Sequence, residues 1–255
     1  MTPSLRIDHV CWSVRGRTVL AGVTFDVRGG ELVALMGKNG AGKSTLLDIV
    51  ASLRQPHAGT VRLDDQPIQA WDPRARARLV AHLPQAVRPD LPFLAGELVL
   101  MGRYPHTDRW FESGDDRTAV ERAMRRTDCW GLRDRVVQTL SGGERQRVLL
   151  AACFAQAPAV LLFDEPSTYL DIDQQLQCFS LLREECAQGA ACLAVTHDLN
   201  LALAYATRIV VLGEGRVVLD LPVETATTTS DWLPLFSTRL TLADTPSGRP
   251  RVYYS

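Results

Sequence analysis

A glycine-rich stretch at residues 37–45, GKNGAGKST, has the composition of a loop that binds phosphate. Gly37, Gly42, Lys43 and Ser44 match the pattern G-x-x-x-x-G-K-[S/T]. Glycines let backbone N–H groups turn inward around phosphate oxygens, Lys43 supplies a cation for the β- and γ-phosphates, and Ser44 supplies a hydroxyl for magnesium. A structural turn of the same composition is the alternative, so the rest of the chain has to decide between the two.

Two acidic residues, Asp164 and Glu165, follow an apolar run in the segment VLLFDEP. A carboxylate at the end of a buried strand is costly unless a positive charge compensates it. Magnesium held on the phosphates by Ser44 is a suitable partner for Asp164, and Glu165 could then orient or deprotonate an attacking water. Two acids at an exposed strand end are the alternative, which the glycine loop at 37–45 disfavours.

A second candidate anion site lies in the segment LSGGERQRV, residues 140–148. Ser141, Gly142 and Gly143 precede a helix-forming run, so a hydroxyl, free N–H groups and a helix N-terminus come together. Ser141 and Glu144 also match a capping box, and the two interpretations are compatible. One nucleotide does not need two phosphate sites on one chain, which indicates that two chains share each nucleotide.

The elements that must position these residues follow from the hydrophobic pattern. Residues 5–10 and 24–27 alternate like antiparallel strands, and the continuous apolar run at 31–36 predicts a strand buried on both faces. A helix is expected over 43–53. Strands alternating with helices predict an α/β fold with a parallel sheet. The further expected elements are a mostly helical region at about 87–156, a strand at 159–163, a helix near 172–186, a strand at 192–196, a helix at 198–206 and a hairpin at 208–220.

Composition limits the class of protein. The chain has 255 residues, which predicts one large domain or a domain with a subdomain, and its net charge of −1 gives no bulk reason to expect nucleic acid or an anionic membrane surface. The first residues lack the pattern of a signal peptide. The longest apolar stretch, 148–163, is shorter than the roughly 20 residues that cross a bilayer, so we interpret it as a helix end, a turn at Pro158 and a buried strand. The six cysteines lack zinc spacing and are expected to be free thiols in a reducing cytosol.

The segment LSGGERQRV resembles the signature of ATP-binding cassette proteins, and the resemblance extends to about residue 223. The loop at 37–45 resembles the family's phosphate loop, with Lys38 where proline is common. The resemblance implies a P-loop NTPase (RecA-like) core with a parallel sheet, an N-terminal antiparallel β subdomain and an inserted α-helical subdomain at about 87–156. We expect the tail at 224–255 to be an appended, loosely packed segment.

The same resemblance implies roles for single residues. Gln85 is similar to the glutamine that reaches magnesium and senses the transmembrane partner, and His197 is similar to the histidine that contacts the γ-phosphate. Residues 167–171, STYLD, resemble the loop that crosses the dimer interface. The implied catalytic residues are Glu165, His197 and Lys43, and the implied Mg²⁺ ligands are Ser44, Gln85 and Asp164. The implied ATP-binding residues are Gly37, Lys38, Asn39, Gly40, Ala41, Gly42, Lys43, Ser44, Thr45, Gln85, Ser141, Gly142, Gly143 and Asp171.

In that family two cassettes close head to tail, which accounts for two phosphate sites on one chain. Residues 37–45 of one copy and 141–143 of the other are expected to enclose each ATP. The family usually stacks adenine on an aromatic residue just after the first strand. That position is Val14 here, and Trp12 lies two residues earlier, where it is equally suited to the core.

Three segments are similar to importers of iron–siderophore complexes, haem and cobalamin: residues 98–108 (LVLMGRYPHTD), 170–177 and 197–218. The turn at 102–106, GRYPH, falls where such cassettes meet the membrane subunit, although a tight turn alone also explains its Gly102 and Pro105. The predicted protein is the ATPase subunit of such an importer. It is expected to bind ATP and Mg²⁺ and to form a homodimer on two transmembrane permease subunits, served by a substrate-binding protein. Its expected location is peripheral, at the cytoplasmic face of the inner membrane.

Two other functions compete with this prediction. The chain could energise another importer or an exporter, which the GRYPH resemblance disfavours. It could also be a soluble cassette ATPase acting on nucleic acid or ribosomes. Such proteins need long coiled-coil insertions or a second cassette, and the sequence contains neither, so we expect no nucleic-acid partner.

Overall fold

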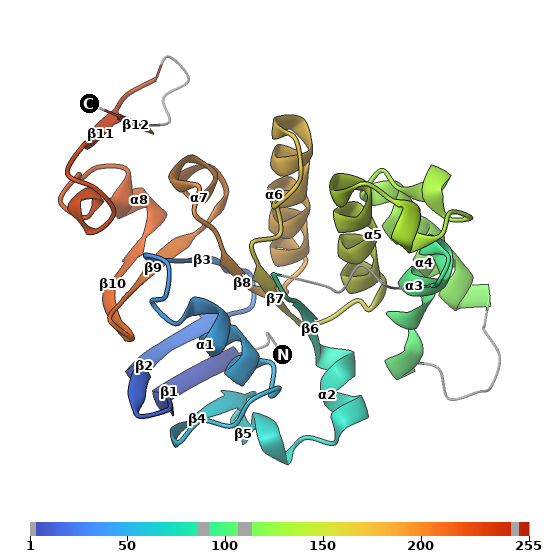
Figure 1. The fold of residues 1–255 in the computed structure, drawn as a ribbon, viewed down its shortest axis with the longest axis horizontal. Coiled ribbons are helices and arrows are strands. Elements are labelled where there is room, and N and C mark those ends of the chain that lie inside the picture. The colour runs from blue at the N-terminus through green and yellow to red at the C-terminus, as the bar shows by residue number, and fades with distance from the viewer. Residues whose placement is uncertain (1–3, 86–91, 107–113, 246–249, 255) are drawn as a thin grey trace.

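A six-stranded sheet forms the centre of the structure, a computed structural model in which residues 4–85, 92–106, 114–245 and 250–254 are described (Figure 1). The strand order is β10-β9-β3-β8-β7-β6, and all neighbours are parallel except β10 and β9. The expected parallel α/β sheet is therefore confirmed. The strands are β3 (Leu32–Met36), β6 (Val80–Leu83), β7 (Val160–Asp164), β8 (Ala191–Val195), β9 (Arg208–Gly213) and β10 (Arg216–Pro222).

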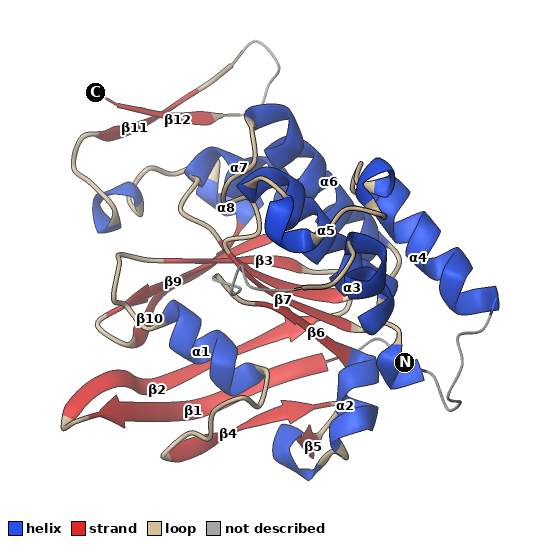
Figure 2. Cartoon of the chain, turned by 45° about the vertical axis from the view of Figure 1, so that its right-hand side comes forward, coloured by secondary structure: helices blue, strands red, loops and turns tan. Residues whose placement is uncertain are grey.

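A second, antiparallel sheet lies below the first in Figure 1 and Figure 2, with helix α1 (Lys43–Val50) between the two. Its strand order is β2-β1-β4-β5, and Ile7 pairs with Phe25 across β1 and β2 as alternation predicts. Apolar residues of α1 and of both sheets belong to one buried cluster. The strands are β1 (Ser4–Val14), β2 (Arg17–Arg28), β4 (Ala58–Leu63) and β5 (Gln66–Pro67).

Strand β3 shows why the sequence of this strand is apolar throughout. Leu32, Ala34 and Met36 belong to the cluster on the helical side of the sheet, whereas Val33 and Leu35 belong to the cluster that contains α1. Because side chains alternate between the faces of a strand, a strand covered on both sides needs apolar residues at every position. The phosphate loop starts directly after this fully buried strand.

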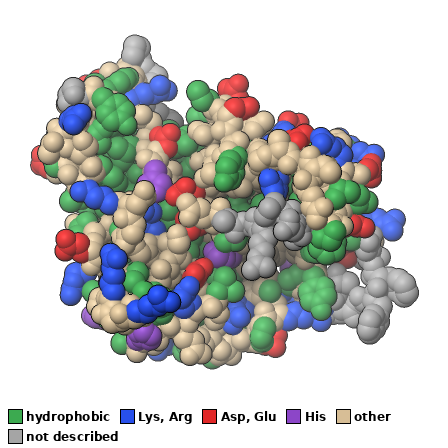
Figure 3. Space-filling view, in the orientation of Figure 1, with side chains coloured by type: hydrophobic (Ala, Val, Ile, Leu, Met, Phe, Trp, Pro, Cys, Tyr) green, Lys and Arg blue, Asp and Glu red, His purple; other side chains and the backbone are tan. Residues whose placement is uncertain are grey.

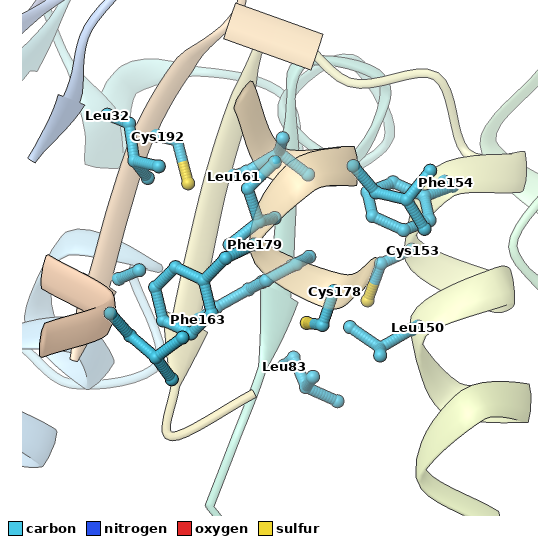
Figure 4. Close-up of a cluster of buried hydrophobic side chains, with 14 of the residues drawn as sticks. Leu32, Leu83, Leu150, Cys153, Phe154, Leu161, Phe163, Cys178, Phe179 and Cys192 are labelled. Carbon is cyan, nitrogen blue, oxygen red and sulfur yellow. The ribbon is translucent and has the colours of Figure 1, made fainter. Parts of the chain in front are cut away.

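Helices cover the other face of the central sheet and extend into a helical group at the right of Figure 1. The core there contains Phe163 from β7, Phe154 and Phe179, and the rings of Phe154 and Phe163 lie 6.2 Å apart (Figure 4). The expected helical region is present in the described residues, although its start at 87 lies outside them. The helices are α2 (Pro73–Leu79), α3 (Ala95–Met101), α4 (Gly114–Arg126), α5 (Gly142–Ala155), α6 (Ile172–Ala187), α7 (Leu199–Tyr205) and α8 (Val223–Ala226).

The apolar stretch at 148–163 is divided as expected. Helix α5 ends at Ala155, Ala157 has a positive φ of 49°, and β7 begins at Val160. None of the helices in the described part of the chain is both long enough and apolar enough to cross a bilayer. The outer surface in Figure 3 has acidic, basic and apolar side chains interspersed, in keeping with the net charge of −1.

The C-terminal tail packs against the domain, so the expectation of loose packing is wrong. Trp232 is 3% exposed, and its Nε1 donates a hydrogen bond of 3.0 Å to the carbonyl oxygen of Ala226. Leu233 and Val252 are buried in the cluster that contains the helices. The tail ends in a hairpin of β11 (Leu240–Ala243) and β12 (Arg251–Tyr254), and residues 246–249 between them lie outside the described residues.

Candidate nucleotide-binding site

The loop at 37–45 has a backbone that only glycine tolerates at its ends. Gly37 has φ of 141°, and a Cβ on it would lie 2.3 Å from the carbonyl oxygen of Leu212 in β9. Gly42 has φ of 101°, and a Cβ there would lie 2.7 Å from the side chain of Leu20. The loop therefore packs closely against β9 and β2 at these two glycines, and its glycine backbone suits the cradling of phosphate oxygens by N–H groups. Helix α1 begins at Lys43 with Gly42 as its N-cap, so the positive end of the helix dipole adds to the site.

Lys43 is bent back over the loop that it follows. Its Nζ donates hydrogen bonds to the carbonyl oxygens of Gly37 at 2.8 Å and Lys38 at 3.1 Å, and the residue is 7% exposed. Burial lowers the pKa of the Lys43 ammonium, and the nearby carboxylates of Glu165 and Asp164 partly offset that shift. A charged ammonium held by two carbonyls is thus placed at the mouth of the phosphate loop.

Asp164 ends β7 with its carboxyl group almost completely buried. The residue is 4% exposed, and burial is the main reason that its pKa is raised, while a hydrogen bond with Ser44 lowers it in part. Its Oδ1 is buried and has no hydrogen-bond partner among the described residues. A buried carboxylate oxygen without a partner, beside a hydroxyl, is a donor set that suits a hard divalent cation such as Mg²⁺.

Glu165 and His197 lie opposite the loop. His197 Nε2 and Glu165 Oε1 are 2.9 Å apart, and the hydroxyl of Thr168 donates to Glu165 Oε2 at 3.3 Å. Glu165 adopts a positive φ of 54°, and its N–H donates to the carbonyl oxygen of Val195 at 3.1 Å. A strained backbone held by the neighbouring strand aims this carboxylate into the site. The contribution of Thr168 could not be read from the sequence, since it depends on the turn after β7.

One pocket of about 370 Å³ collects most of the expected residues. The glycine loop forms one wall, and Gln85, Glu165 and His197 form the other. Val19 also lines this pocket. It lies in β2, which pairs with the strand β1 that ends at Val14, and the sequence alone did not assign it a role. The lining residues are Val19, Asn39, Gly40, Gly42, Lys43, Ser44, Thr45, Gln85, Glu165 and His197.

The second candidate anion site does not line this pocket. Ser141 is the N-cap of α5, where its Oγ accepts from the N–H of Glu144 at 3.3 Å and its own N–H donates to the Glu144 carboxylate at 2.8 Å. This is the capping box that the sequence predicted. Gly142 and Gly143 lie against Tyr169. A Cβ on Gly142 would lie 3.2 Å from the Tyr169 side chain, and a Cβ on Gly143 would lie 3.0 Å from the Tyr169 carbonyl oxygen.

Asp171 also lies outside the pocket. It is the N-cap of α6 and accepts from the N–H of Gln174 at 2.9 Å. Tyr169, two residues earlier, has φ of 68° and is 73% exposed. The loop at 167–171 therefore presents an acid and an aromatic ring to the surface, next to Ser141 and its two glycines.

The two candidates for the adenine contact are placed differently. The ring of Trp12 stacks on His57 with centroids 6.0 Å apart, and the guanidinium of Arg54 lies 4.5 Å over it, so both neighbours occupy its surroundings. Val14 is 43% exposed and lines a neighbouring pocket of about 380 Å³ that shares Val19 and Gly40 with the pocket beside the phosphate loop. An adenine next to the phosphate loop would therefore meet Val14 before Trp12.

Comparison with known proteins agrees with this geometry. Residues 20–168 match the family model described as ABC transporter. The chain is 44% identical over 219 residues to the Hemin import ATP-binding protein HmuV of Rhodococcus jostii (strain RHA1), covering 86% of this chain and 75% of that protein. It is 42% identical over 203 residues to the Cobalamin import ATP-binding protein BtuD of Halobacterium salinarum (strain ATCC 29341), covering 79% of this chain and 51% of that protein.

A solved structure shows a similar arrangement. A dimeric ATP-binding cassette in a post-hydrolysis state with ADP and Pi superimposes with a TM-score of 0.76 at 27% identity, over 86% of this chain and 98% of that one. The six-stranded sheet, the antiparallel sheet and the helical group are thus those of the known cassettes. By its matched family model, its relatives and its fold, the chain belongs to the ABC transporter family, as an ATPase of that family.

Proposed function

We propose that the chain is the ATP-hydrolysing subunit of an importer that takes up a metal chelate, such as haem, a ferric siderophore or cobalamin. The observation that carries the proposal is the single pocket in which Lys43, Glu165 and His197 face the same space. The printed names of two relatives, hemin import and cobalamin import, support the class of cargo. The membrane subunits select the cargo, so this chain supplies the energy for uptake.

The residues of the pocket have complementary tasks in the attack of water on the γ-phosphate. The backbone N–H groups of residues 37–45 and the ammonium of Lys43 bind the phosphate oxygens and stabilise the charge that they carry. The carboxylate of Glu165 holds the attacking water and accepts its proton. His197, whose Nε2 lies 2.9 Å from Glu165 Oε1, orients that carboxylate, and its imidazole stabilises charge near the γ-phosphate.

Ser44, Asp164 and Gln85 are the residues that would hold Mg²⁺. Ser44 and Gln85 line the pocket. The Oδ1 of Asp164 is buried and has no hydrogen-bond partner among the described residues, which fits a cation ligand. When bound, Mg²⁺ neutralises charge on the β- and γ-phosphates. The chain itself keeps the Asp164 carboxyl desolvated and aimed at the site, so its oxygen is ready to bind a cation.

The active unit is a homodimer in this proposal. Ser141, Gly142, Gly143 and Asp171 lie outside the pocket of their own chain. Ser141 and the two glycines offer a helix N-terminus to an anion, and Asp171 caps the neighbouring helix α6. A second copy placed head to tail would bring these residues onto the phosphates bound at residues 37–45. The dimeric cassette with ADP and Pi that superimposes on this chain supports such an assembly.

The permease is proposed to bind at the turn 102–106, at the cytoplasmic face of the membrane. Tyr104 is 76% exposed and Met101 is 45% exposed, so two large side chains are available for a partner. Two contacts hold the turn in place. Arg78 Nε donates to the carbonyl oxygen of Pro105 at 2.7 Å, and His106 Nε2 lies 2.8 Å from the carbonyl oxygen of Gln156. Thr107 and Asp108 of the same stretch lie outside the described residues.

The substitution Glu165→Gln tests the chemistry. We expect ATP hydrolysis to fall by about 100-fold or more, because the amide cannot accept the proton of water, while binding of an ATP analogue is retained. Glu184→Gln is a matched control, since Glu184 is an exposed partner of Arg126 outside the pocket. Hydrolysis at a near-normal rate in Glu165→Gln would contradict the assignment.

The cargo requires the assembled transporter. The chain is combined with its permease subunits and substrate-binding protein in liposomes, and ATPase activity is measured with haem, a ferric siderophore or cobalamin added outside. One of these metal chelates is expected to stimulate hydrolysis. A complex that hydrolyses ATP but responds to none of the three would leave the ATPase assignment intact and overturn the class of cargo.

A further inference from the structure

The side chain of Asn200 in α7 is hydrogen-bonded to the C-terminal hairpin. The Nδ2 group of Asn200 donates to the carbonyl oxygen of Val252 at 3.2 Å, and its Oδ1 accepts from the N–H of Val252 at 2.9 Å. In an antiparallel pair the N–H and C=O of one residue point to the same side. Val252 therefore turns its backbone groups away from β11 and toward α7, and the side-chain amide of Asn200 pairs with them as a neighbouring strand would.

Helix α7 needs such support because it is short. It has seven residues, Leu199–Tyr205, and isolated helices of this length are not stable in water. Leu201, Ala202 and Leu203 are buried, and the ring of Tyr205 lies 5.9 Å from that of Phe179 in α6. Those contacts hold α7 to the domain, and Asn200 adds a polar contact to the tail.

His197 lies two residues before the first residue of α7, next to the N-cap residue Asp198. The N-terminus of α7 is capped by Asp198, whose Oδ1 accepts from the N–H of Leu201 at 2.9 Å, and the N–H of Asp198 donates to the hydroxyl of Thr196 at 3.1 Å. His197 therefore lies between a buried strand, β8, and a capped helix start. A shift of α7 along its axis would move His197 away from Glu165, whose Oε1 is 2.9 Å from its Nε2.

The tail is itself well fixed, so it can serve as a support. Ala226, Trp232, Leu233 and Val252 are all buried in the core cluster, and the rings of Trp232 and Phe236 meet edge to face at 5.9 Å. The link from tail to pocket thus runs from Val252 through Asn200 and α7 to His197. Val252 and Asn200 are hydrogen-bonded to each other, and the backbone leads from the start of α7 through Asp198 to His197.

We propose that Asn200 is a positioning residue for hydrolysis: it couples the C-terminal hairpin to α7 and thereby holds His197 in register with Glu165. This inference rests on the proposed role of His197 in ATP hydrolysis. It gives the segment after residue 223 a function in turnover. Asn200 does not line the nucleotide pocket, so nucleotide binding is not expected to depend on it.

The test compares Asn200→Ala with two other variants of the full-length chain. Asn200→Asp keeps the acceptor for the Val252 N–H but loses the donor to its carbonyl oxygen, so it should fall between wild type and Asn200→Ala. Gln177→Ala is the matched control, because Gln177 also donates a side-chain amide to a backbone oxygen, that of Arg126 at 3.0 Å, far along the chain from the tail. Thermal melts establish that each variant is folded at the assay temperature.

We expect kcat for ATP hydrolysis to fall about three- to tenfold in Asn200→Ala, with KM for ATP changed less than twofold. Hydrogen exchange of the peptide that spans 196–205 should become faster in Asn200→Ala and stay unchanged in Gln177→Ala. An unchanged kcat in Asn200→Ala, or an equal loss in Gln177→Ala, overturns the inference. If Glu165→Gln loses activity but Asn200→Ala hydrolyses ATP like wild type, the inference about Asn200 is overturned and the proposed function stands.

Discussion

The two candidate anion-binding segments of this chain, 37–45 and 141–143, both contain glycines at the start of a helix but are built in different ways. The first has glycines at φ values that other residues avoid, and its outer surface touches β9 and β2 so closely that no Cβ fits at Gly37 or Gly42. The second has an ordinary backbone, and the hydroxyl and N–H of Ser141 are already hydrogen-bonded to Glu144 in a capping box. Both place N–H groups at the start of a helix.

The difference indicates how each segment reaches its ligand. The first is a rigid pocket wall inside one chain, with Lys43 and Asp164 desolvated beside it. The second is a capped helix start outside the pocket of its own chain, so in the proposed homodimer it contacts nucleotide only when a second copy binds. A site that is complete only after two copies close makes hydrolysis depend on assembly. Four substitutions can break or sharpen this contrast.

The largest effect is expected from Gly37→Ala. Its Cβ would lie 2.3 Å from the carbonyl oxygen of Leu212 at a φ of 141°, so β9 and the loop must separate. We expect the free energy of unfolding to fall by about 3 kcal/mol, measured by thermal melts. We also expect binding of an ATP analogue to be lost, measured by fluorescence titration. Gly40→Ala, at φ of 80° with open space around it, should cost only about 1 kcal/mol. Equal losses in both variants would show that close packing does not shape the loop.

Ser141→Ala should separate binding from turnover. Loss of the cap costs about 1 kcal/mol of stability, as does Asp72→Ala at the similarly capped start of α2. Because Ser141 lies outside the pocket of its own chain, ATP-analogue binding by the monomer should stay the same, whereas hydrolysis should fall about 100-fold if it completes the partner's site. Hydrolysis equal to that of Asp72→Ala would sink the idea of a shared site.

Asp164→Asn tests whether the first site sacrifices stability for metal binding. The buried carboxyl, whose pKa burial raises, disfavours the folded metal-free chain at neutral pH. The amide removes that charge, so the metal-free variant should be about 1 kcal/mol more stable in a urea titration, while Mg²⁺-dependent hydrolysis is lost. A variant that is less stable without metal would mean that the carboxylate is well solvated in place.

Glu144→Gln is expected to act weakly and in the opposite direction. The backbone N–H of Ser141 is the main cause that lowers the pKa of the Glu144 carboxyl below 4.5. A lowered pKa means that the charged form stabilises the fold above pH 4.5 and that this gain is lost as pH falls through the folded value. At pH 7 wild type should be more stable than the variant by less than about 1 kcal/mol, and this difference in stability should shrink as the pH falls below 4.5. A stability difference that does not change with pH would mean that the charge of Glu144 does not cause it.

Local patterns predicted the elements that carry the pocket. The apolar run before Gly37, the period of the helix after it and the acids at the end of β7 each depend on residues close in sequence. The strand β6 and the helix α2 were not predicted, because VAHL and PRARARL are too short for a clear period. Packing of the tail was also missed, since Trp232 and Val252 acquire their partners from distant parts of the chain.

The sequence by itself determined that this chain binds phosphate and which residue types surround it, because glycine, lysine and carboxylate spacing is a local property of the backbone. Only the tertiary structure decided that Lys43, Glu165 and His197 face one pocket while Ser141 and Asp171 do not, and that Val14 is nearer the pocket than Trp12. Those outcomes depend on which strands become neighbours in the sheet. That choice comes from burial of apolar surface across the whole chain rather than from any single motif.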